Sequence, residues 1–199
     1  MLRAAKLRGF TIIEVLITVS LMSILMFLGQ SVFTTWTANA KARSLAEAIQ
    51  NGVRAAQAEA VRRNRQVAFV LTNAAPAANV AAVANGRNWY IQVLPIVAGE
   101  TVNTPYVQGS STGSLTAGMS VTGPALICFN SQGRITTNSA AAVTTAFGMT
   151  CAATTANYAV TSTSANVTDR TFNVQVAMGG KVRMCDASRT LSTTNPDGC

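Results

Sequence analysis

The chain has 199 residues, which is enough for one folded domain and an additional long helix but hardly for two full domains. Hydrophobic residues make up 49% of the sequence and charged residues 11%, and much of the apolar excess lies between Phe10 and Phe33. The formal net charge is +8, and the absence of histidine excludes the usual general base, the common catalytic triads and most metal centres. The seven acidic residues are scattered and no nucleotide-binding fingerprint is present, so we expect neither an enzyme nor a cofactor.

The N-terminal part combines a short basic leader, residues 1–9, with an apolar segment, residues 10–33, that is long enough to cross a bilayer as a helix. The positive leader favours the cytoplasmic side, which leaves the C-terminal body in the periplasm. Glu14 lies inside the apolar segment, where a carboxylate is unfavourable without a cationic partner, so it is a candidate functional residue. A secretory signal cleaved near residues 38–40 is the alternative. The length of the apolar segment, Glu14 and the continuing helical pattern argue against that alternative.

The segment from Lys6 to Val15, KLRGFTIIEV, resembles the prepilin peptidase motif of type IV pilins and type II secretion pseudopilins. The resemblance implies that the peptidase cleaves after Gly9 and that Phe10 becomes the N-methylated first residue. It also implies that Glu14 contacts the N-terminal amine of a neighbouring subunit, and two charges removed from water do need each other. The implied fold is α+β, with a long N-terminal helix packed on an antiparallel β-sheet head. The implied partners are other pilin or pseudopilin subunits, the prepilin peptidase/methylase and inner-membrane lipid.

Residues 34–64 are predicted to continue the helix as an amphipathic half that packs against the head. Apolar residues recur at spacings of three and four, as in one buried helix face; they are Leu45, Ile49, Val53, Ala56 and Ala60. The basic residues at its end, Arg62, Arg63 and Arg65, suit either the helix macrodipole or phosphate contacts, and we favour the former. The stretch from Asn51 to Val70 is similar to the GspH/FimT branch of the pilin superfamily.

Residues 65–199 are predicted to form a β-rich periplasmic head. Strands are expected where β-branched and aromatic residues gather or alternate; the ranges are 65–72, 87–94, 126–130, 134–137, 169–177 and 181–185. Gly133 and the Gly179–Gly180 pair are expected to form the turns of two hairpins. The sequence CFNSQGRIT around Gly133 is similar to an element of the GspH/FimT family. Residues 98–123 and 137–168 are expected to be loops or irregular connections.

The four cysteines all lie in the part of the chain that would be translocated, and none forms a CxxC pair. An even number of cysteines in an oxidising compartment favours two disulfides over a four-cysteine zinc site, because structural zinc usually takes closely spaced pairs. Four cysteines allow three pairings. We favour Cys185 with Cys199, which would close a polar tail, and Cys128 with Cys151, which would hold the loop after the first hairpin.

The function implied by these resemblances is structural, and three forms of it remain. The chain is expected to be a minor type IV pilin that helps to initiate or cap the filament, or else a GspH-like pseudopilin of type II secretion. The third form is a FimT-like minor pilin that binds DNA, because Gly180 to Arg183, GKVR, is similar to a Gly-Arg-x-Arg element of those proteins. The candidate DNA-binding residues are Lys181, Arg183, Arg189 and Arg134. The alternative, which we favour, is that Lys181 and Arg183 are solvated charges on an edge strand.

Overall fold

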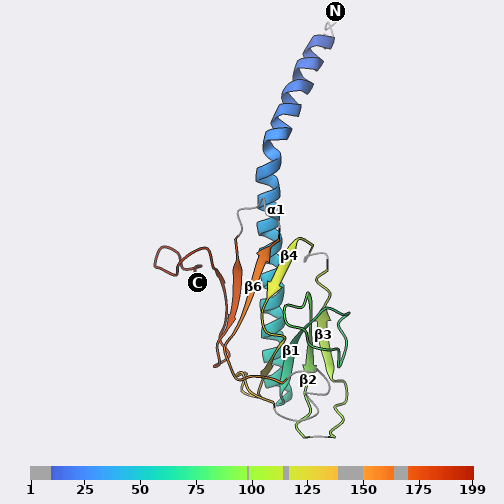
Figure 1. The fold of residues 1–199 in the computed structure, drawn as a ribbon, viewed down its shortest axis with the longest axis vertical. Helices are drawn as coiled ribbons and strands as arrows, with labels where there is room; N and C mark the ends of the chain where they lie inside the picture. Colours follow the sequence, from blue (N-terminus) through green and yellow to red (C-terminus); the bar gives the residue numbers. More distant parts are fainter. Residues whose placement is uncertain (1–9, 98, 114–116, 139–149, 164–169) are drawn as a thin grey trace, which may run out of the picture.

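The computed structural model describes residues 10–97, 99–113, 117–138, 150–163 and 170–199 of the chain. The predicted leader, residues 1–9, lies outside the described residues, and Gly9 at the predicted cleavage position lies outside them with it. The described part consists of one long helix, α1, and a head that contains eight β-strands in two sheets (Figure 1).

Helix α1 spans Ile12–Arg63 and has 52 residues, so it is about 78 Å long at 1.5 Å per residue. Thr11 caps its N-terminus, where the hydroxyl oxygen accepts a hydrogen bond from the Glu14 N–H at 3.3 Å. At the C-terminus Asn64 adopts a left-handed conformation with φ of 51°, and its N–H donates to the carbonyl oxygen of Ala60. The long helix expected from the sequence is present as one continuous element.

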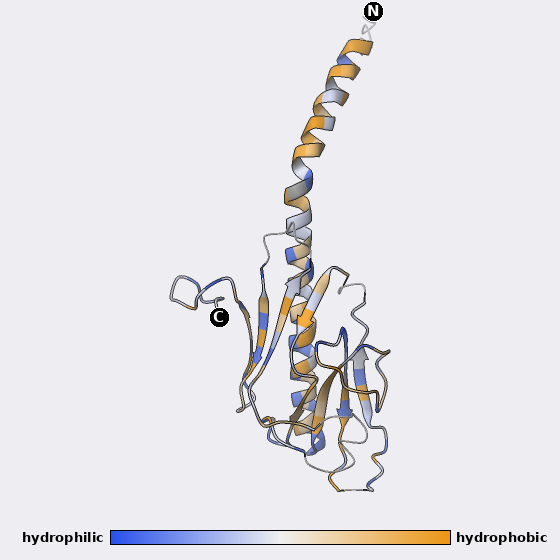
Figure 2. Cartoon of the chain, in the orientation of Figure 1, coloured by the Kyte–Doolittle hydropathy of each residue, from blue (hydrophilic) through white to orange (hydrophobic). Residues whose placement is uncertain are grey.

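The two halves of α1 have opposite environments. From residue 10 to residue 34 the described side chains are exposed, and this half extends away from the head as a largely apolar rod (Figure 2). The stripe predicted for the second half is buried in the head with exposed fractions of 1% or less; its members are Leu45, Ile49, Val53, Ala56 and Ala60. One half of the helix therefore builds the core of the head, and the other half is not covered by any described part of the chain.

The head contains two antiparallel four-stranded sheets. The first has the order β3-β2-β1-β5, formed by Tyr106–Ser110, Asn88–Val93, Val67–Thr72 and Leu126–Phe129. The second has the order β4-β6-β7-β8, formed by Met119–Thr122, Ala156–Ser162, Phe172–Val176 and Val182–Asp186. Both sheets pack against the second half of α1 (Figure 1). The fold is α+β, as the sequence predicts.

The main core lies between α1 and both sheets. Phe69 of β1 is completely buried, and its ring centroid lies 5.6 Å from that of Trp89 in β2 and 5.8 Å from that of Tyr158 in β6. Because Tyr158 belongs to the second sheet, this aromatic group joins the two sheets over the helix. A smaller buried cluster, which includes Tyr90 and Cys128, covers the opposite face of the first sheet.

Three strands lie where the sequence analysis expected loops, so that prediction was wrong. Strands β3, β4 and β6 fall inside the two ranges 98–123 and 137–168. Their Tyr, Val and Thr residues favour strands but are interrupted by Ser, Asn, Ala and Gly, which do not, and strand stability depends mainly on packing. In β6 that packing comes from pairing with β7 and from burial of Tyr158 and Val160 in the main core. Residues 139–149 and 164–168 of the second range lie outside the described residues.

The hairpin predicted around Gly133 is only partly present. Gly133 has a positive φ of 72° in the expected turn, and β5 provides the first strand. The expected strand over residues 134–137 was wrong, because within this range Ile135 makes a single isolated bridge to Phe129. The Ile135 N–H instead donates to the carbonyl oxygen of Met178, in the turn of the other hairpin, at 3.0 Å. The hairpin of β7 and β8 is formed as expected, although Asp169, in the predicted first strand, lies outside the described residues.

A C-terminal tail follows β8 and folds back, so that its last residues lie beside the end of β8. Cys185 and Cys199 form a disulfide with a Cα–Cα distance of 5.1 Å, and Asp186 forms a parallel bridge with Gly198. The second disulfide joins Cys128 to Cys151 with a Cα–Cα distance of 5.8 Å. These are the two pairings that the sequence analysis favours. The tail projects beside the second sheet (Figure 1).

Candidate functional site: the exposed half-helix and the charged turns of the head

The predicted cleavage and assembly residues lie at the free end of α1. Phe10 is 84% exposed and directly precedes the cap residue Thr11. Glu14 lies in the first turn of α1, where the partial positive charge of the helix N-terminus favours a carboxylate. The Thr-x-x-Glu spacing is that of a capping box, and its Thr11 half is formed. Within the described residues no basic side chain pairs with the Glu14 carboxylate, so among them the helix dipole is the favourable electrostatic contribution at this position.

The exposed half of α1 is long and apolar enough to cross a membrane, and it is the one such helix in the described residues. Its exposed fractions are high on every side of the helix, for example 66% at Ile13, 68% at Leu25 and 72% at Val32. A helix that is apolar all around is stable in lipid or when surrounded by other apolar helices, and not in water. This half-helix is therefore a surface that needs either a bilayer or neighbouring subunits.

Gln57 of α1 brings the two predicted turns of the head together. Its side-chain amide donates to the carbonyl oxygen of Gly133 at 2.7 Å and to that of Gly180 at 2.9 Å. Lys181 and Arg134 directly follow these glycines, so they lie on adjoining turns, and both are exposed. The sequence analysis did not identify Gln57, because nothing in the helix sequence shows that two turns from distant parts of the head meet it.

The other two candidate DNA-binding residues, Arg183 and Arg189, form hydrogen bonds with groups of the C-terminal tail. A guanidinium N–H of Arg183 donates to the carbonyl oxygens of Gly198 at 2.5 Å and Pro196 at 3.3 Å. Arg189 donates to the carboxylate of Asp197 at 3.0 Å. The four candidates thus form two separate pairs, and the pair in the tail has its charged groups engaged within the chain.

Asp186 is a buried carboxylate that the sequence analysis did not identify. Its side chain is 3% exposed, and one carboxylate oxygen lies 3.6 Å from Arg170 and 3.9 Å from Arg189. The other oxygen accepts hydrogen bonds from the backbone N–H and the hydroxyl of Ser188. A buried charge with two cations beside it serves structure, because it fixes the start of the tail to the start of β7.

The arginines at the end of α1 are engaged in ion pairs. Arg62 and Arg63 both donate to Glu59, with an Arg62 Nε to Glu59 Oε2 distance of 2.7 Å. These hydrogen bonds, of which the one from Arg62 acts most strongly, lower the pKa of Glu59 to about 2. Arg65 pairs with Glu100, which lowers the pKa of that carboxyl. The arrangement agrees with the structural role that the sequence analysis favours for these arginines.

Two family models match parts of the chain. A model of the Type II transport protein GspH matches residues 45–180, which is more than half of the chain. The chain belongs to the GspH family. A model of the prokaryotic N-terminal methylation motif separately matches residues 5–29, which include Gly9, Phe10 and Glu14. The GspH match covers the second half of α1 and most of the head, so helix and head together place the chain in the minor type IV pilin and pseudopilin group.

A solved structure of a minor pilin is similar in fold to this GspH family member. The crystal structure of type IV minor pilin FimU from Pseudomonas aeruginosa in space group P21 has 16% sequence identity and a TM-score of 0.50, and the match covers 77% of this chain and 95% of FimU. The structure of FimU in space group P65 has 14% identity, a TM-score of 0.47 and coverage of 74% and 94%. A search of curated proteins gave no significant match. The resemblance to GspH/FimT-type minor pilins and the α+β pilin fold are thus confirmed.

Proposed function

We propose that the chain is a minor type IV pilin, a structural subunit that helps to initiate or cap a pilus. The observation that carries the proposal is the division of α1 into an exposed apolar half and a half that forms the core of the head. A filament whose centre is built from such half-helices removes their apolar surface from water, at about 25 cal/mol per Å². The same half-helix would anchor the subunit in the membrane before assembly.

The N-terminal steps belong to the same proposal. The methylation motif supports cleavage after Gly9 by a prepilin peptidase and methylation of the new Phe10 amine. The Glu14 carboxylate pairs with no basic side chain among residues 10–199 that the structure describes, and the Phe10 amine of an adjacent subunit would supply a cation. The protein would enter the bacterial inner membrane with a cytoplasmic N-terminus and a periplasmic head, and would then join the filament.

The alternative is a pseudopilin of a type II secretion system, which the match to the family of the type II transport protein GspH favours. The same α1 and the same N-terminal motif would serve that assembly equally well. FimU is a type IV minor pilin, and its likeness to this chain supports the fold. Deleting the gene in its native host distinguishes the two: loss of surface pili with normal secretion of exoproteins supports a minor pilin, and the reverse supports a pseudopilin.

Two variants of the full chain test the proposal in that host. We expect Gly9→Leu to remain as an uncleaved precursor in the inner membrane, because a side chain at this position obstructs the peptidase. We expect Glu14→Ala to be cleaved normally but to be lost from the sheared filament fraction. The intact mass of the protein in the membrane fraction shows whether it has been cleaved, and immunoblots of the sheared filaments show whether it has been incorporated. Assembly of both variants at the wild-type level contradicts the proposal.

A further inference from the structure

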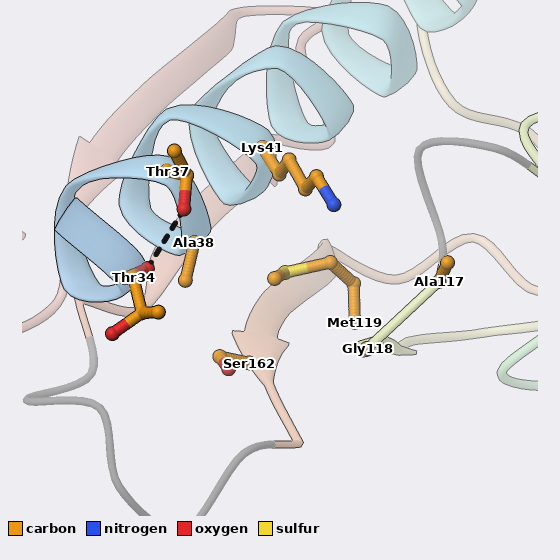
Figure 3. A pocket seen from close by; sticks show the side chains of 8 residues that line it. All are labelled: Thr34, Thr37, Ala38, Lys41, Ala117, Gly118, Met119 and Ser162. Carbon is orange, nitrogen blue, oxygen red and sulfur yellow. Dashed lines mark hydrogen bonds between the residues drawn. The ribbon is translucent and has the colours of Figure 1, made fainter. Parts of the chain in front are cut away.

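A cavity of about 200 Å³ lies where the exposed half of α1 enters the head (Figure 3). One wall is a stripe of α1 formed by Thr34, Thr37, Ala38 and Lys41. The other wall is the start of β4, at Gly118 and Met119, together with the end of β6. Figure 3 shows the side chain of Lys41 extending from the helix toward the start of β4.

The position of this cavity along α1 matches the headgroup layer of a membrane. Residues 12–33 of α1 are about 33 Å long, and the hydrocarbon core of a bilayer is about 30 Å thick with a polar layer of about 5–7 Å on each side. The cavity begins at Thr34, directly after the apolar segment, and Lys41 lies about 10 Å further along the helix axis. A long lysine side chain can bring its ammonium group back toward the membrane surface.

Trp36 independently indicates that this turn of α1 lies at the level of the lipid headgroups. Its side chain is 68% exposed, and its ring lies 6.5 Å from that of Phe33 between centroids. Tryptophan is enriched at the level of lipid headgroups, because its ring is apolar and its N–H is polar. An exposed tryptophan three residues after the apolar segment thus places this turn of α1 at the membrane surface.

The charge of the cavity suits an anion. None of the described residues that line it is acidic, and Lys41 forms no ion pair with a described residue. The hydroxyl of Thr37 donates to the backbone carbonyl of Thr34 at 2.9 Å, so its proton is used within the helix. The Lys41 ammonium group, with three N–H donors, is therefore the group that defines the ligand.

A second cavity of about 300 Å³ lies on another side of the same helix turn, but it is less suited to an anion. It contains the guanidinium groups of Arg43 and Arg170. Arg43 pairs with Glu47 at 2.9 Å, and Arg170 lies 3.6 Å from the buried Asp186. Each cation of this second cavity is already paired with a carboxylate of the chain, whereas Lys41 forms no ion pair with any described carboxylate.

We propose that the cavity between Lys41 and the start of β4 binds the phosphate of an anionic phospholipid while the subunit resides in the membrane. The inference rests on the proposed membrane-anchored state of the pilin. The phosphate would lie beside the Lys41 ammonium group, and the acyl chains would run along the apolar half of α1 below Thr34. Such a contact fixes the height of the head above the membrane before the subunit leaves the bilayer.

The test measures lipids retained by the full chain. Wild-type protein, Lys41→Gln and Lys41→Arg are purified in detergent with equal amounts of phosphatidylglycerol and phosphatidylcholine, and native mass spectrometry counts the lipids that remain bound. A cation near an anionic headgroup contributes a preference of about fivefold. We expect Lys41→Gln to lower the ratio of phosphatidylglycerol to phosphatidylcholine about fivefold and Lys41→Arg to keep it.

Lys181→Gln is the matched control, because Lys181 is the other lysine outside the leader and lies in the turn between β7 and β8. The basic residues of the leader are identical in all variants, so they do not affect the comparison. An unchanged lipid ratio in Lys41→Gln overturns the inference, and so does an equal loss in Lys181→Gln. Inorganic phosphate that abolishes the lipid preference also overturns it, since a free anion is then the ligand. If Lys41→Gln keeps the wild-type lipid ratio but is lost from filaments, the lipid inference is overturned and the cavity binds a neighbouring subunit instead.

The lipid inference and the proposed function fail in different ways. A chain that enters the membrane and assembles but shows no lipid preference contradicts the lipid site alone. A chain that never joins a filament contradicts the proposed function, whatever lipid it retains. The circular dichroism spectrum of each variant is compared with that of the wild type to exclude misfolding as the cause.

Discussion

The side-chain amide of Gln57 donates a hydrogen bond of 2.9 Å to the carbonyl oxygen of Gly180. The same amide donates to Gly133 at 2.7 Å, so one residue of α1 connects the turns of both sheets. Gly180 has φ of 91°, and a Cβ atom there would lie 2.2 Å from the Gly133 carbonyl oxygen. The close contact of the two turns thus requires glycine at position 180 and a long amide at position 57.

Replacing Gln57 by alanine is expected to lower the free energy of unfolding by about 1–3 kcal/mol, because two carbonyl oxygens lose their hydrogen bonds in a partly buried place. Thermal unfolding of the full chain in detergent measures the change. Gln132→Ala is the control, because Gln132 lies in the turn at Gly133 but is exposed. Equal melting temperatures for Gln57→Ala and Gln132→Ala would show that the bridge does not stabilise the head.

The pKa of Glu59 predicts how the end of α1 responds to acid. Its folded pKa of about 2 lies below the ordinary value of 4.5, so the stabilisation that its ion pairs provide is complete above about pH 4.5 and is lost as the pH falls toward 2. We expect Glu59→Gln to cost ~1 kcal/mol at neutral pH, because Arg62 is largely exposed and its pairing is screened by solvent. Melting temperatures of both proteins are measured from pH 7 to pH 2.5.

The difference between wild type and Glu59→Gln should shrink as the pH falls below 4.5. Glu47→Gln is the control, since Glu47 lies on the same helix and its pair with Arg43 is more exposed, at 47% and 63%. A difference that stays constant down to pH 2.5 would mean that the carboxylate of Glu59 contributes through packing and not through charge.

Arg183 is expected to hold the C-terminal tail. Replacing it by glutamine removes charged hydrogen bonds to the carbonyl oxygens of Pro196 and Gly198, and a charged hydrogen bond contributes about 1.5–3 kcal/mol. Local opening should therefore increase, and trypsin should cleave after Arg189 roughly tenfold faster. The disulfide of Cys185 keeps the cut tail attached, so cleavage appears as a mass increase of one water.

Lys181→Gln is the control for this experiment, because Lys181 precedes β8 and faces solvent. It should leave the cleavage rate after Arg189 unchanged. Equal rates for wild type and Arg183→Gln would show that the disulfide alone holds the tail.

The parts of the fold that follow from short-range sequence patterns were predictable. The apolar stripe from Leu45 to Ala60 has the period of a helix, and the structure buries it. β6 has the sequence ANYAVTS, in which Tyr158 and Val160 alternate with small polar residues, and this alternation was available in the sequence but was not recognised. The strand expected at residues 134–137 failed because Ile135 bonds to Met178 in the turn between β7 and β8, a contact that no local pattern shows.

Among the candidate site residues, the sequence gives the type of side chain but not its partner. Lys181 and Arg183 are two residues apart in one motif, yet Lys181 is exposed and Arg183 bonds to the tail. Gln57 and Asp186 looked ordinary because their roles depend on contacts between distant segments. The partner of a charged group is set by tertiary packing, so it becomes visible only in the structure.

DNA binding by the head stays a prediction, and the structure sharpens its test. If Lys181 and Arg134 contact DNA phosphates, Lys181→Gln and Arg134→Gln should each weaken binding to duplex DNA. Each should also reduce the slope of log K against log salt concentration by about one. Arg183→Gln should have a smaller effect, because its guanidinium group already donates to the tail. Fluorescence anisotropy over a salt series measures all of these proteins as full chains in detergent. Absence of salt-sensitive binding in the wild type excludes the DNA-binding function.

The two glycines inside α1 should respond oppositely to alanine. Alanine stabilises a helix by about 1 kcal/mol relative to glycine. At Gly29 a Cβ atom would meet nothing within 4 Å, so Gly29→Ala is expected to be neutral or stabilising in detergent. At Gly52 a Cβ atom would lie 2.8 Å from the Phe69 ring and 3.1 Å from the Trp89 ring.

Phe69 cannot move away from a new methyl group at position 52, because its ring is completely buried between Trp89 and Tyr158. Overpacking of a closed core costs about 1–3 kcal/mol, which exceeds the gain in helix propensity. We therefore expect Gly52→Ala to lower the melting temperature of the head and to change the near-ultraviolet circular dichroism of Trp89. A melting temperature of Gly52→Ala at or above that of Gly29→Ala would show that the aromatic group linking the two sheets is looser than its contacts indicate.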